Sequence, residues 1–440
     1  MDFRAAEATR YQRQSSVGRA GAEGLTALSA GLARLLADKY PNTNLVFSPL
    51  SIYTALALVA AGARGATLDE ILRFLGVQSR GELDKFVAAA VDTLHDRSGS
   101  GGPRVTFACG VWTDLSCPLK PEFREAMVDG AYMADASIVD FRGDPNGACE
   151  MINTWAAHVT KGLIESILNP DSVTRDTRIV LGNAVYFKGK WDQPFHKRDT
   201  KNAPFHRLGN VDPVNVPFMR SWKKQFIAVH DGFKVLKLQY KKVDARADPR
   251  EPAPFLPGRV PLVNPYATAS PRHDSNNSLN FTSNTRFSMC IFLPDANDGL
   301  PSVMEVFASR SGFVHEHLPH RKVDVCDFRI PMFKLSFHHN VVDILRNLGL
   351  QLPFSSAANL SNMTEERQLL VNEVIHKAVI EVNEEGTEAA AVSILCMQVM
   401  ACERTPPVDF VADHPFAYFI VEEETGVIVF AGHVFDPSRE

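Results

Sequence analysis

The interpretation of this chain starts from NEEGTEAAAVSILCMQVMACERTPPVDFVADHPF, residues 383–416. No charge occurs from 389 to 402, and the centre of this run is rich in β-branched and aliphatic residues, which is the composition of a β-strand. Gly386 precedes the run and Pro406 and Pro407 follow it, so it is bounded like a loop that leaves a fold and returns. An exposed strand invites edge pairing and aggregation, which suggests that this one has a function.

The composition is that of an ordinary globular protein. The chain has 440 residues, of which 45% are hydrophobic and 22% charged, and its formal net charge is −5. This charge argues against a nucleic-acid partner, which would require a basic face. No apolar stretch reaches the roughly 18 residues of a membrane span, and the N-terminus MDFRAAEATRYQRQSS has no apolar signal core. We therefore expect a cytoplasmic protein without a membrane partner, and an extracellular or vacuolar location by another route stays open.

Seven cysteines are dispersed along the chain without the spacing of a metal site. An odd number of cysteines in a chain without a signal peptide is typical of reduced thiols in the cytosol. We expect most of them to be small core residues, and we expect no metal and no cofactor. They are Cys109, Cys117, Cys149, Cys290, Cys326, Cys396 and Cys402.

Helical patterns dominate the first third of the chain and strand patterns the rest. Leucines recur at helical spacing over 25–36, and Ser48 before Pro49 is typical of a helix start. Thr67 with Glu70 predicts a capping box at the start of a further helix. Later runs such as TRIVLGNAVYF and VIHKAVIEV read as strands. Helices early and strands late, without βαβ alternation, predict an α+β fold around large mixed or antiparallel sheets.

One segment does not fit a compact domain. Residues 242–286 have seven prolines between 249 and 271 and no helical or strand period, which predicts a disordered surface insertion between two strands. We therefore expect a polar N-terminal extension over 1–23 and a single domain over 24–440 that carries this insertion.

A search for catalytic motifs finds none. The chain has no GxSxG, no phosphate-binding glycine loop and no HExxH. His338 and His339 are adjacent, so in a strand they would point to opposite faces and could not bind one metal ion together. A cysteine activated by a distant histidine stays an alternative, and it would require a thiol of low pKa.

Four long motifs occur in order along the chain: NLVFSPLSIYTALALVAAGARGATLDEIL, LGNAVYFKGKWDQPF, IHKAVIEVNEEGTEAAA and DFVADHPFAYFIVEEETGVIVFAGHVFDP. Together they resemble the serpins, and DFVADHPF with the signal-less N-terminus resembles the plant branch of that family. The resemblance covers residues 24–437 apart from 242–286. It implies one domain with three β-sheets, eight to nine helices and an exposed reactive-centre loop, here 384–409.

In inhibitory serpins a protease cleaves this loop, and the loop then enters the central sheet and deforms the acyl-enzyme. An inserted loop becomes a central strand, so one parity of its residues must tolerate burial. In this chain that parity is uncharged, with small residues where the strands must separate first and larger ones later. Its members are Thr387, Ala389, Ala391, Ser393, Leu395, Met397 and Val399.

The resemblance also implies site residues. The reactive bond joins Met400 to Ala401, and a long apolar side chain at Met400 suits chymotrypsin-like and elastase-like proteases, whereas Val399 suits papain-like ones. The hinge of the loop comprises Gly386, Thr387, Glu388, Ala389, Ala390, Ala391 and Val392. The shutter, a polar cluster beneath the strands that open, comprises Ser48, Ser51, Asn183 and His376. The breach, where the loop first enters, comprises Trp191, Lys334 and Glu384, and an ion pair of the last two would hold it shut.

These observations predict a monomeric inhibitor of serine, and also papain-like cysteine, endopeptidases, and not an enzyme. A non-inhibitory serpin that serves as a storage, chaperone or carrier protein is the alternative. That alternative would be favoured by bulky or charged residues at 389–391, where this chain has three alanines. The third hypothesis is the cysteine-dependent enzyme.

Overall fold

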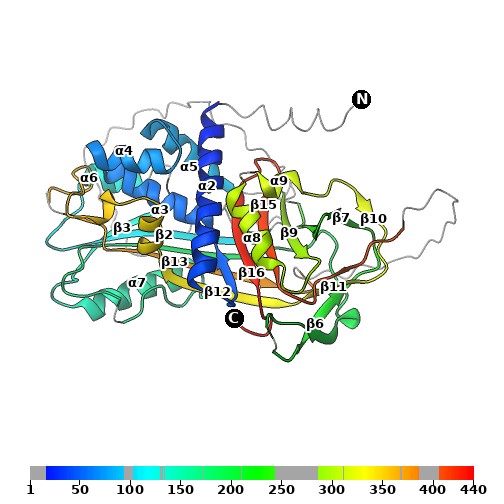
Figure 1. Ribbon diagram of the computed structural model, residues 1–440. Helices are drawn as coiled ribbons and strands as arrows, with labels where there is room; N and C mark the ends of the chain where they lie inside the picture. Colours follow the sequence, from blue (N-terminus) through cyan, green and yellow to red (C-terminus); the bar gives the residue numbers. More distant parts are fainter. Residues whose placement is uncertain are drawn as a thin grey trace, which may run out of the picture.

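The structure is a computed structural model that describes residues 16–93, 103–128, 132, 134–170, 172–209, 211–242, 286–310, 312–366, 369–385 and 406–440 (Figure 1). Over these ranges it has nine α-helices: α2 (Ser16–Lys39), α3 (Pro49–Gly62), α4 (Gly65–Phe74), α5 (Arg80–Thr93), α6 (Pro121–Val128), α7 (Pro145–Val159), α8 (Leu300–Ser309), α9 (Phe313–Glu316) and α10 (Val342–Asn347). The strands of the first half are β1 (Leu45–Phe47), β2 (Arg104–Asp114), β3 (Asp135–Val139), β4 (Ile179–Lys188), β5 (Lys201–Phe205), β6 (Val214–Arg220), β7 (Gln225–His230) and β8 (Phe233–Gln239). Those of the second half are β9 (Phe287–Pro294), β10 (Lys322–Val323), β11 (Phe328–Pro331), β12 (Phe333–Asn340), β13 (Glu373–Val382), β14 (Phe410–Val411), β15 (Phe416–Glu422) and β16 (Ile428–Val434).

The strands form three sheets, and the predicted α+β class is confirmed. A five-stranded sheet has the order β12-β13-β4-β2-β3, a seven-stranded sheet the order β1-β16-β15-β9-β8-β7-β10, and a four-stranded sheet the order β14-β11-β6-β5. In the five-stranded sheet, β13 and β4 are parallel neighbours, whereas each of them is antiparallel to its other neighbour. The five-stranded and four-stranded sheets are mixed, because each contains at least one parallel pair, whereas every pair in the seven-stranded sheet is antiparallel.

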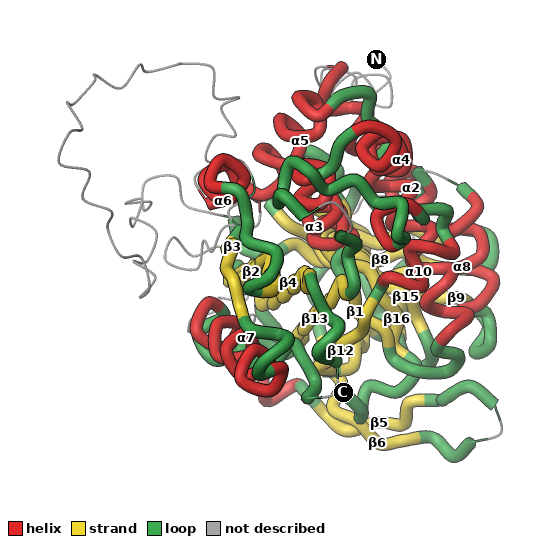
Figure 2. The backbone as a smooth tube through the Cα atoms, turned by 90° about the vertical axis from the view of Figure 1, so that its left-hand side faces the viewer, coloured by secondary structure: helices red, strands yellow, loops and turns green. Residues whose placement is uncertain are grey.

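The five-stranded sheet lies between two apolar layers (Figures 1 and 2). On one face, α7 packs through Ile152 and Ala156, and the Trp112 and Trp155 rings meet edge to face at 4.7 Å between centroids. The other face belongs to the large core that it shares with α3 and the seven-stranded sheet. Alternation of side chains along each strand therefore sends every second residue toward α7 and the rest toward α3. Both faces of the sheet are covered.

The helix starts differ in how well the local sequence predicted them. Ser48 caps α3 as expected, because its side chain accepts a hydrogen bond from the Ser51 N–H and Pro49 occupies the first turn. The predicted capping box is wrong, because α4 begins at Gly65, and the Thr67 hydroxyl accepts a hydrogen bond from the Asn359 N–H at 3.0 Å instead. Thr67 therefore makes a tertiary contact with Asn359 and does not cap the helix in the way that the local pattern had predicted.

The first helix begins earlier than the expected domain boundary. Helix α2 starts at Ser16, so residues 16–23 of the predicted extension are helical, and residues 1–15 lie outside the described residues. Most of the predicted insertion, 243–285, also lies outside them. No helix among the described residues is long and apolar enough to cross a membrane.

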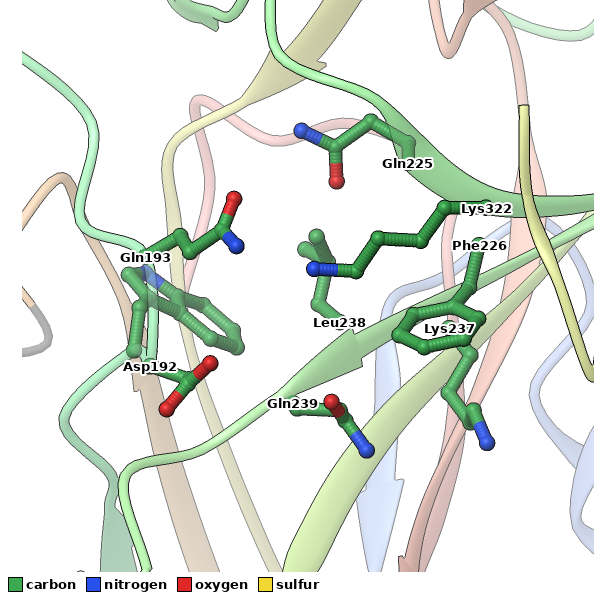
Figure 3. Close-up of a pocket in the computed structure, with 9 residues that line it drawn as sticks. Asp192, Gln193, Gln225, Phe226, Lys237, Leu238, Gln239 and Lys322 are labelled. Carbon is green, nitrogen blue, oxygen red and sulfur yellow. The ribbon is translucent and has the colours of Figure 1, made fainter. Parts of the chain in front are cut away.

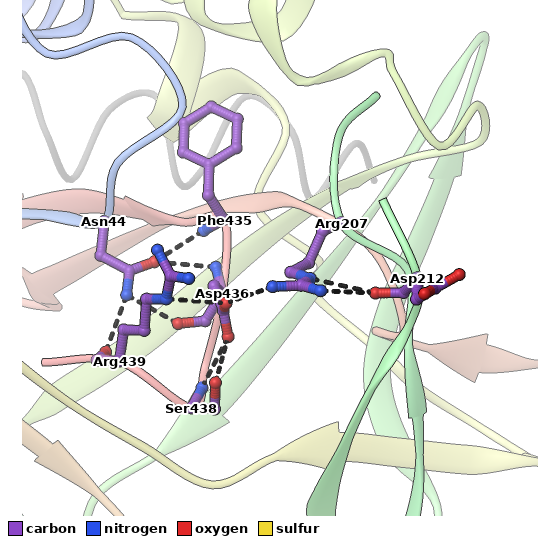
Figure 4. Close-up of polar contacts among 7 residues, drawn as sticks. All are labelled: Asn44, Arg207, Asp212, Phe435, Asp436, Ser438 and Arg439. Carbon is purple, nitrogen blue, oxygen red and sulfur yellow. Dashed lines mark hydrogen bonds and ion pairs between the residues drawn. The ribbon is translucent and has the colours of Figure 1, made fainter. Parts of the chain in front are cut away.

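The C-terminal residues are tied to the start of the seven-stranded sheet by polar contacts (Figure 4). The Asn44 side-chain oxygen accepts hydrogen bonds from the backbone N–H groups of Phe435 and Asp436 at 2.8 and 2.9 Å. The Asp436 carboxylate also pairs with Arg207, which follows β5, at 3.3 Å. These contacts join β1, the chain end and the four-stranded sheet.

Candidate functional site

The parallel pairing of β4 with β13, called the seam below, is the structural centre of the candidate site. Its register runs from Glu373 opposite Val180 to Ile380 opposite Phe187. Strand β13 leads directly into residues 386–405, which lie outside the described residues, and the chain re-enters the fold before β14. The hinge residues 386–392 and the bond between Met400 and Ala401 therefore also lie outside them.

The four predicted shutter residues come together beneath the seam. His376 on β13 lies directly opposite Asn183 on β4. The His376 Nε2 is 3.1 Å from the backbone nitrogen of Ser48, and its Nδ1 is 3.3 Å from the Ser51 hydroxyl. The Asn183 amide donates a hydrogen bond to the Ser51 carbonyl at 2.8 Å. Helix α3 thus holds both strands through one polar cluster.

The hydrogen bonds fix the protonation state of His376. The Ser48 N–H can only donate, so Nε2 must accept and the proton lies on Nδ1, which donates to the Ser51 hydroxyl. The side chain is fully buried, and burial lowers the pKa of His376 to about 3. A protonated ring would direct an Nε2–H at the Ser48 N–H. The cluster is closed only with a neutral imidazole.

At the carboxyl end of the seam, Trp191 and the segment after it hold the chain where the predicted loop begins. Its indole Nε1–H donates to the Asn383 carbonyl at 2.8 Å, and its ring stacks on Tyr240 with centroids 4.4 Å apart. The Phe195 N–H donates to the Glu384 carbonyl at 3.0 Å, and Lys197 pairs with Glu385. The chain that leaves β13 is therefore attached to the segment after β4.

The predicted ion pair between Lys334 and Glu384 is wrong. Lys334 pairs with Glu440 near the C-terminus. In the strand register Lys334 lies opposite Glu381, whose carboxylate is already held by Lys188 at 2.9 Å. Glu384 lies three residues further along, beyond the paired part of β12, and it is 9% exposed. At this end of the seam, contacts to the Asn383 and Glu384 carbonyls take the place of that ion pair.

At the amino end of the seam, Asn372 joins the two strands in a way that sequence reasoning missed. Its side-chain oxygen accepts hydrogen bonds from the N–H groups of Arg178 and Ile179, at 3.0 and 3.3 Å. Ile179 is the first residue of β4 and Arg178 immediately precedes it, and Asn372 immediately precedes β13. The asparagine just before a predicted strand was the only signal in the sequence. Its partner Ile179 is 193 residues away, so the local sequence pattern could not identify it.

The face of the seam toward α7 is also closed by polar contacts. The Lys377 ammonium donates to the Ser166 carbonyl at 2.8 Å, and the His338 Nε2 lies 2.9 Å from the Ile167 carbonyl. His339 points to the other face and contacts the Tyr40 hydroxyl through Nδ1 at 2.8 Å, so the predicted opposite orientation of the two histidines is confirmed. The segment after α7 is thus attached across β12 and β13.

Two of the buried cysteines lack the low pKa that a nucleophilic thiol requires. Cys109, Cys117, Cys149 and Cys290 are buried free thiols, and Cys326 is exposed. Burial raises the pKa of Cys109 and of Cys290 to about 12, the opposite of what a nucleophile requires. The described part of the chain contains no group of three or more residues that could hold a metal ion.

Comparisons with known proteins agree with this geometry. The family model described as serpin (serine protease inhibitor) matches residues 23–247 and 266–437. A protein of Oryza sativa subsp. japonica described as putative serpin-Z8 is 47% identical, with 99% of each chain covered, and serpin-ZX of Hordeum vulgare is 41% identical, with 90% of each covered. The solved structure of Arabidopsis AtSerpin1 in its native stressed conformation superimposes with a TM-score of 0.82 at 35% identity, covering 97% of this chain and 100% of that one.

Proposed function

Because the chain belongs to the serpin family, we propose that it inhibits serine endopeptidases, and also papain-like cysteine endopeptidases, as a suicide substrate. Membership supports protease inhibition in general and not an enzymatic activity. In this proposal the reactive-centre loop spans 384–409, a protease cleaves it between Met400 and Ala401, and hinge residues 386–392 enter the sheet first. The inhibitor acts as a monomer without a cofactor.

The observation that carries the proposal is the parallel pairing of β4 and β13. A loop that leaves the carboxyl end of β13 and turns back runs antiparallel to β13, and it is then antiparallel to β4 as well. Insertion replaces one parallel seam with two antiparallel ones in a six-stranded sheet. Antiparallel pairing is slightly more stable per residue than parallel pairing, so the exchange favours insertion.

The magnitude of the exchange is sufficient to distort a bound enzyme. An inserted loop adds about a dozen backbone hydrogen bonds at a net ~1 kcal/mol each. Burial of Leu395, Met397 and Val399 adds ~1.5–3 kcal/mol for each side chain. The total is comparable to the whole stability of a domain, roughly 5–15 kcal/mol, although ordering entropy opposes it. The polar contacts of Asn372, His376 and Trp191 keep the seam closed until cleavage.

The test is to mix the protein with chymotrypsin, an elastase and papain and to separate the products on a denaturing gel. We expect a covalent complex with at least one of them and a marked rise in the melting temperature of the cleaved protein. A matched control is Thr387→Arg, which places a charge on the buried parity near the entry point. This variant should be cleaved at the same bond without forming a complex. Clean cleavage of the parent protein without complex and without a change in melting temperature would instead favour a storage, chaperone or carrier role.

A further inference from the structure

Trp222 is a prominent surface feature that loop insertion does not use. Its side chain is 65% exposed, although tryptophan is highly buried on average in folded proteins. It lies in the turn between β6 and β7, and the Ser221 hydroxyl holds this turn by accepting hydrogen bonds from the Lys223 N–H and the Gln225 amide, at 3.2 and 3.1 Å. The indole is therefore presented to solvent by an ordered turn.

The part of the chain that contains Trp222 is rich in cations. From 188 to 242 the chain has thirteen Lys and Arg residues against four Asp and no Glu, although its overall net charge is −5. Lys223, beside the indole, is exposed. Lys322 on the edge strand β10 lies opposite Phe226 of β7, with its ammonium 5.1 Å from the ring centroid (Figure 3). An exposed aromatic side chain is typical of a protein contact surface, and the cations near it favour an acidic partner.

This surface adjoins the point where the loop returns to the fold. Lys224 pairs with Asp324 at 3.1 Å, and the Asp324 carbonyl accepts a hydrogen bond from the Val408 N–H at 2.9 Å. The reactive bond expected after Met400 lies only eight residues before Val408. Fully extended, eight residues span at most about 29 Å.

A protease bound at that bond lies within reach of this surface. A domain of roughly 230 residues has a radius of gyration of about 17 Å, so its diameter exceeds the reach of the loop. The part of the protease that binds the residues after the cleaved bond is thus the part that faces the β6–β7 turn. Contacts made there act before cleavage and need no insertion.

We propose that Trp222, Lys223 and Lys322 form a secondary contact surface for the target protease, which carries an acidic patch around an apolar centre next to its active-site cleft. This inference rests on the proposed function, since it takes a protease as the partner. The surface selects among proteases that could all cleave at the same loop residue. It does so through encounter rate and affinity, because exposed charges steer association and a central tryptophan contributes most of the contact energy.

The experiment measures noncovalent binding to two chymotrypsin-like proteases whose catalytic serine is replaced by alanine, one with net negative and one with net positive charge. We expect the protein to bind the acidic protease at least tenfold more tightly. Trp222→Ala should weaken that binding about tenfold, and Lys223→Glu should do so at low salt and less at high salt. The matched control is Leu115→Ala, which removes another apolar side chain of similar exposure, 61%, next to the end of β2.

These binding measurements test the contact surface independently of whether the protein inhibits proteases. Inactive proteases cannot be trapped, so a change in binding with Trp222→Ala supports the surface even if the gel experiment shows cleavage without complex. Equal binding by the parent protein, Trp222→Ala and Leu115→Ala overturns it. A Lys223→Glu variant that loses binding to a sulfated polysaccharide but not to the acidic protease assigns the surface to polyanions and also overturns the proposal.

Discussion

Two histidines, His376 on β13 and His433 on β16, are similarly buried but contact different elements of the fold. Both are at most 1% exposed, and burial lowers the pKa of His376 to about 3 and that of His433 to about 4. His433 contacts the Thr43 carbonyl at 3.0 Å, just before β1. His376 instead contacts α3, a helix outside its own sheet, and lies opposite Asn183 across the seam. Only the contacts of His376 would be broken by separating two strands.

The two sheets that contain these histidines also differ in strand pairing and in the polar contacts between their strands. In the seven-stranded sheet, β15 lies between β9 and β16 in antiparallel pairing, and all of its residues are buried. The seam in the five-stranded sheet is parallel and is held at its two ends and its middle by Asn372, Trp191 and His376. Nine of the ten residues of β4 are buried as well, so the two sheets differ at these strands in the polar contacts that cross the seam and not in apolar burial. Under the proposed function, the five-stranded sheet opens at this seam and the seven-stranded sheet stays closed.

The largest effect is expected from a disulfide across the seam. Val185 and Ala378 are direct neighbours in the register of β4 and β13, and adjacent strands are about 4.8 Å apart, within the range that a disulfide spans. The double variant Val185→Cys with Ala378→Cys, when oxidised, should lose complex formation with proteases entirely, because the loop cannot enter. Reduction should restore it. Complex formation is measured on denaturing gels before and after reduction.

A matched pair in the seven-stranded sheet serves as the control. Ala228 and Val235 are direct neighbours in the register of β7 and β8. Oxidised Ala228→Cys with Val235→Cys should trap proteases as the parent does, since these strands need not separate. Loss of trapping in both double variants, or in neither, would remove the distinction between the two sheets.

The next effect is the pH dependence of stability. A histidine whose pKa is lower in the folded than in the unfolded protein stabilises the fold at neutral pH, and this contribution is lost as pH falls from about 6.5 toward the folded value. His376 and His433 should each contribute about 1.4 kcal/mol per pH unit over this window, down to about pH 4. Urea unfolding of intact His376→Gln and His433→Gln between pH 4 and 7 should show a shallower slope than the parent.

Cleavage of the loop should separate the two contributions. In the loop-inserted form that we propose, the neighbours of His376 should change, whereas those of His433 should not. The slope difference between the parent and His376→Gln should therefore shrink after cleavage, and the difference for His433→Gln should persist. Identical behaviour of the two variants in both forms would mean that the seam does not open at the shutter.

The sequence predicted the fold class because that class depends on patterns within continuous segments, whereas the four shutter residues were implied by the resemblance to the serpins. Local pattern placed only parts of that cluster. Ser48 and Ser51 lie in one capped helix, and His376 lies on the apolar parity of its strand. The ion pair of Lys334 with Glu384 was not predicted correctly, because Glu440 lies close to Lys334 only in the folded chain. Asn372 was missed for the same reason. Partners that are distant in sequence require the register of the strands, which local pattern does not determine.

The smallest effect is expected from Asn372→Ala at the amino end of the seam. The variant removes the acceptor of two backbone N–H groups, worth about 1–2 kcal/mol together, and in a chain of this length this loss should lower the melting temperature of the intact protein by about 1–2 °C. Insertion should become faster, because less must be broken before β4 and β13 separate.

Asn44 is the matched comparison, because its side-chain oxygen also accepts from two backbone N–H groups, those of Phe435 and Asp436, but at the seven-stranded sheet (Figure 4). Asn44→Ala should destabilise the intact and the cleaved protein alike. Asn372→Ala should destabilise only the intact form, since the strands it joins are already apart once the loop lies between them. Thermal unfolding of both variants, before and after cleavage, decides whether this contact belongs to the part of the molecule that opens or to the part that does not.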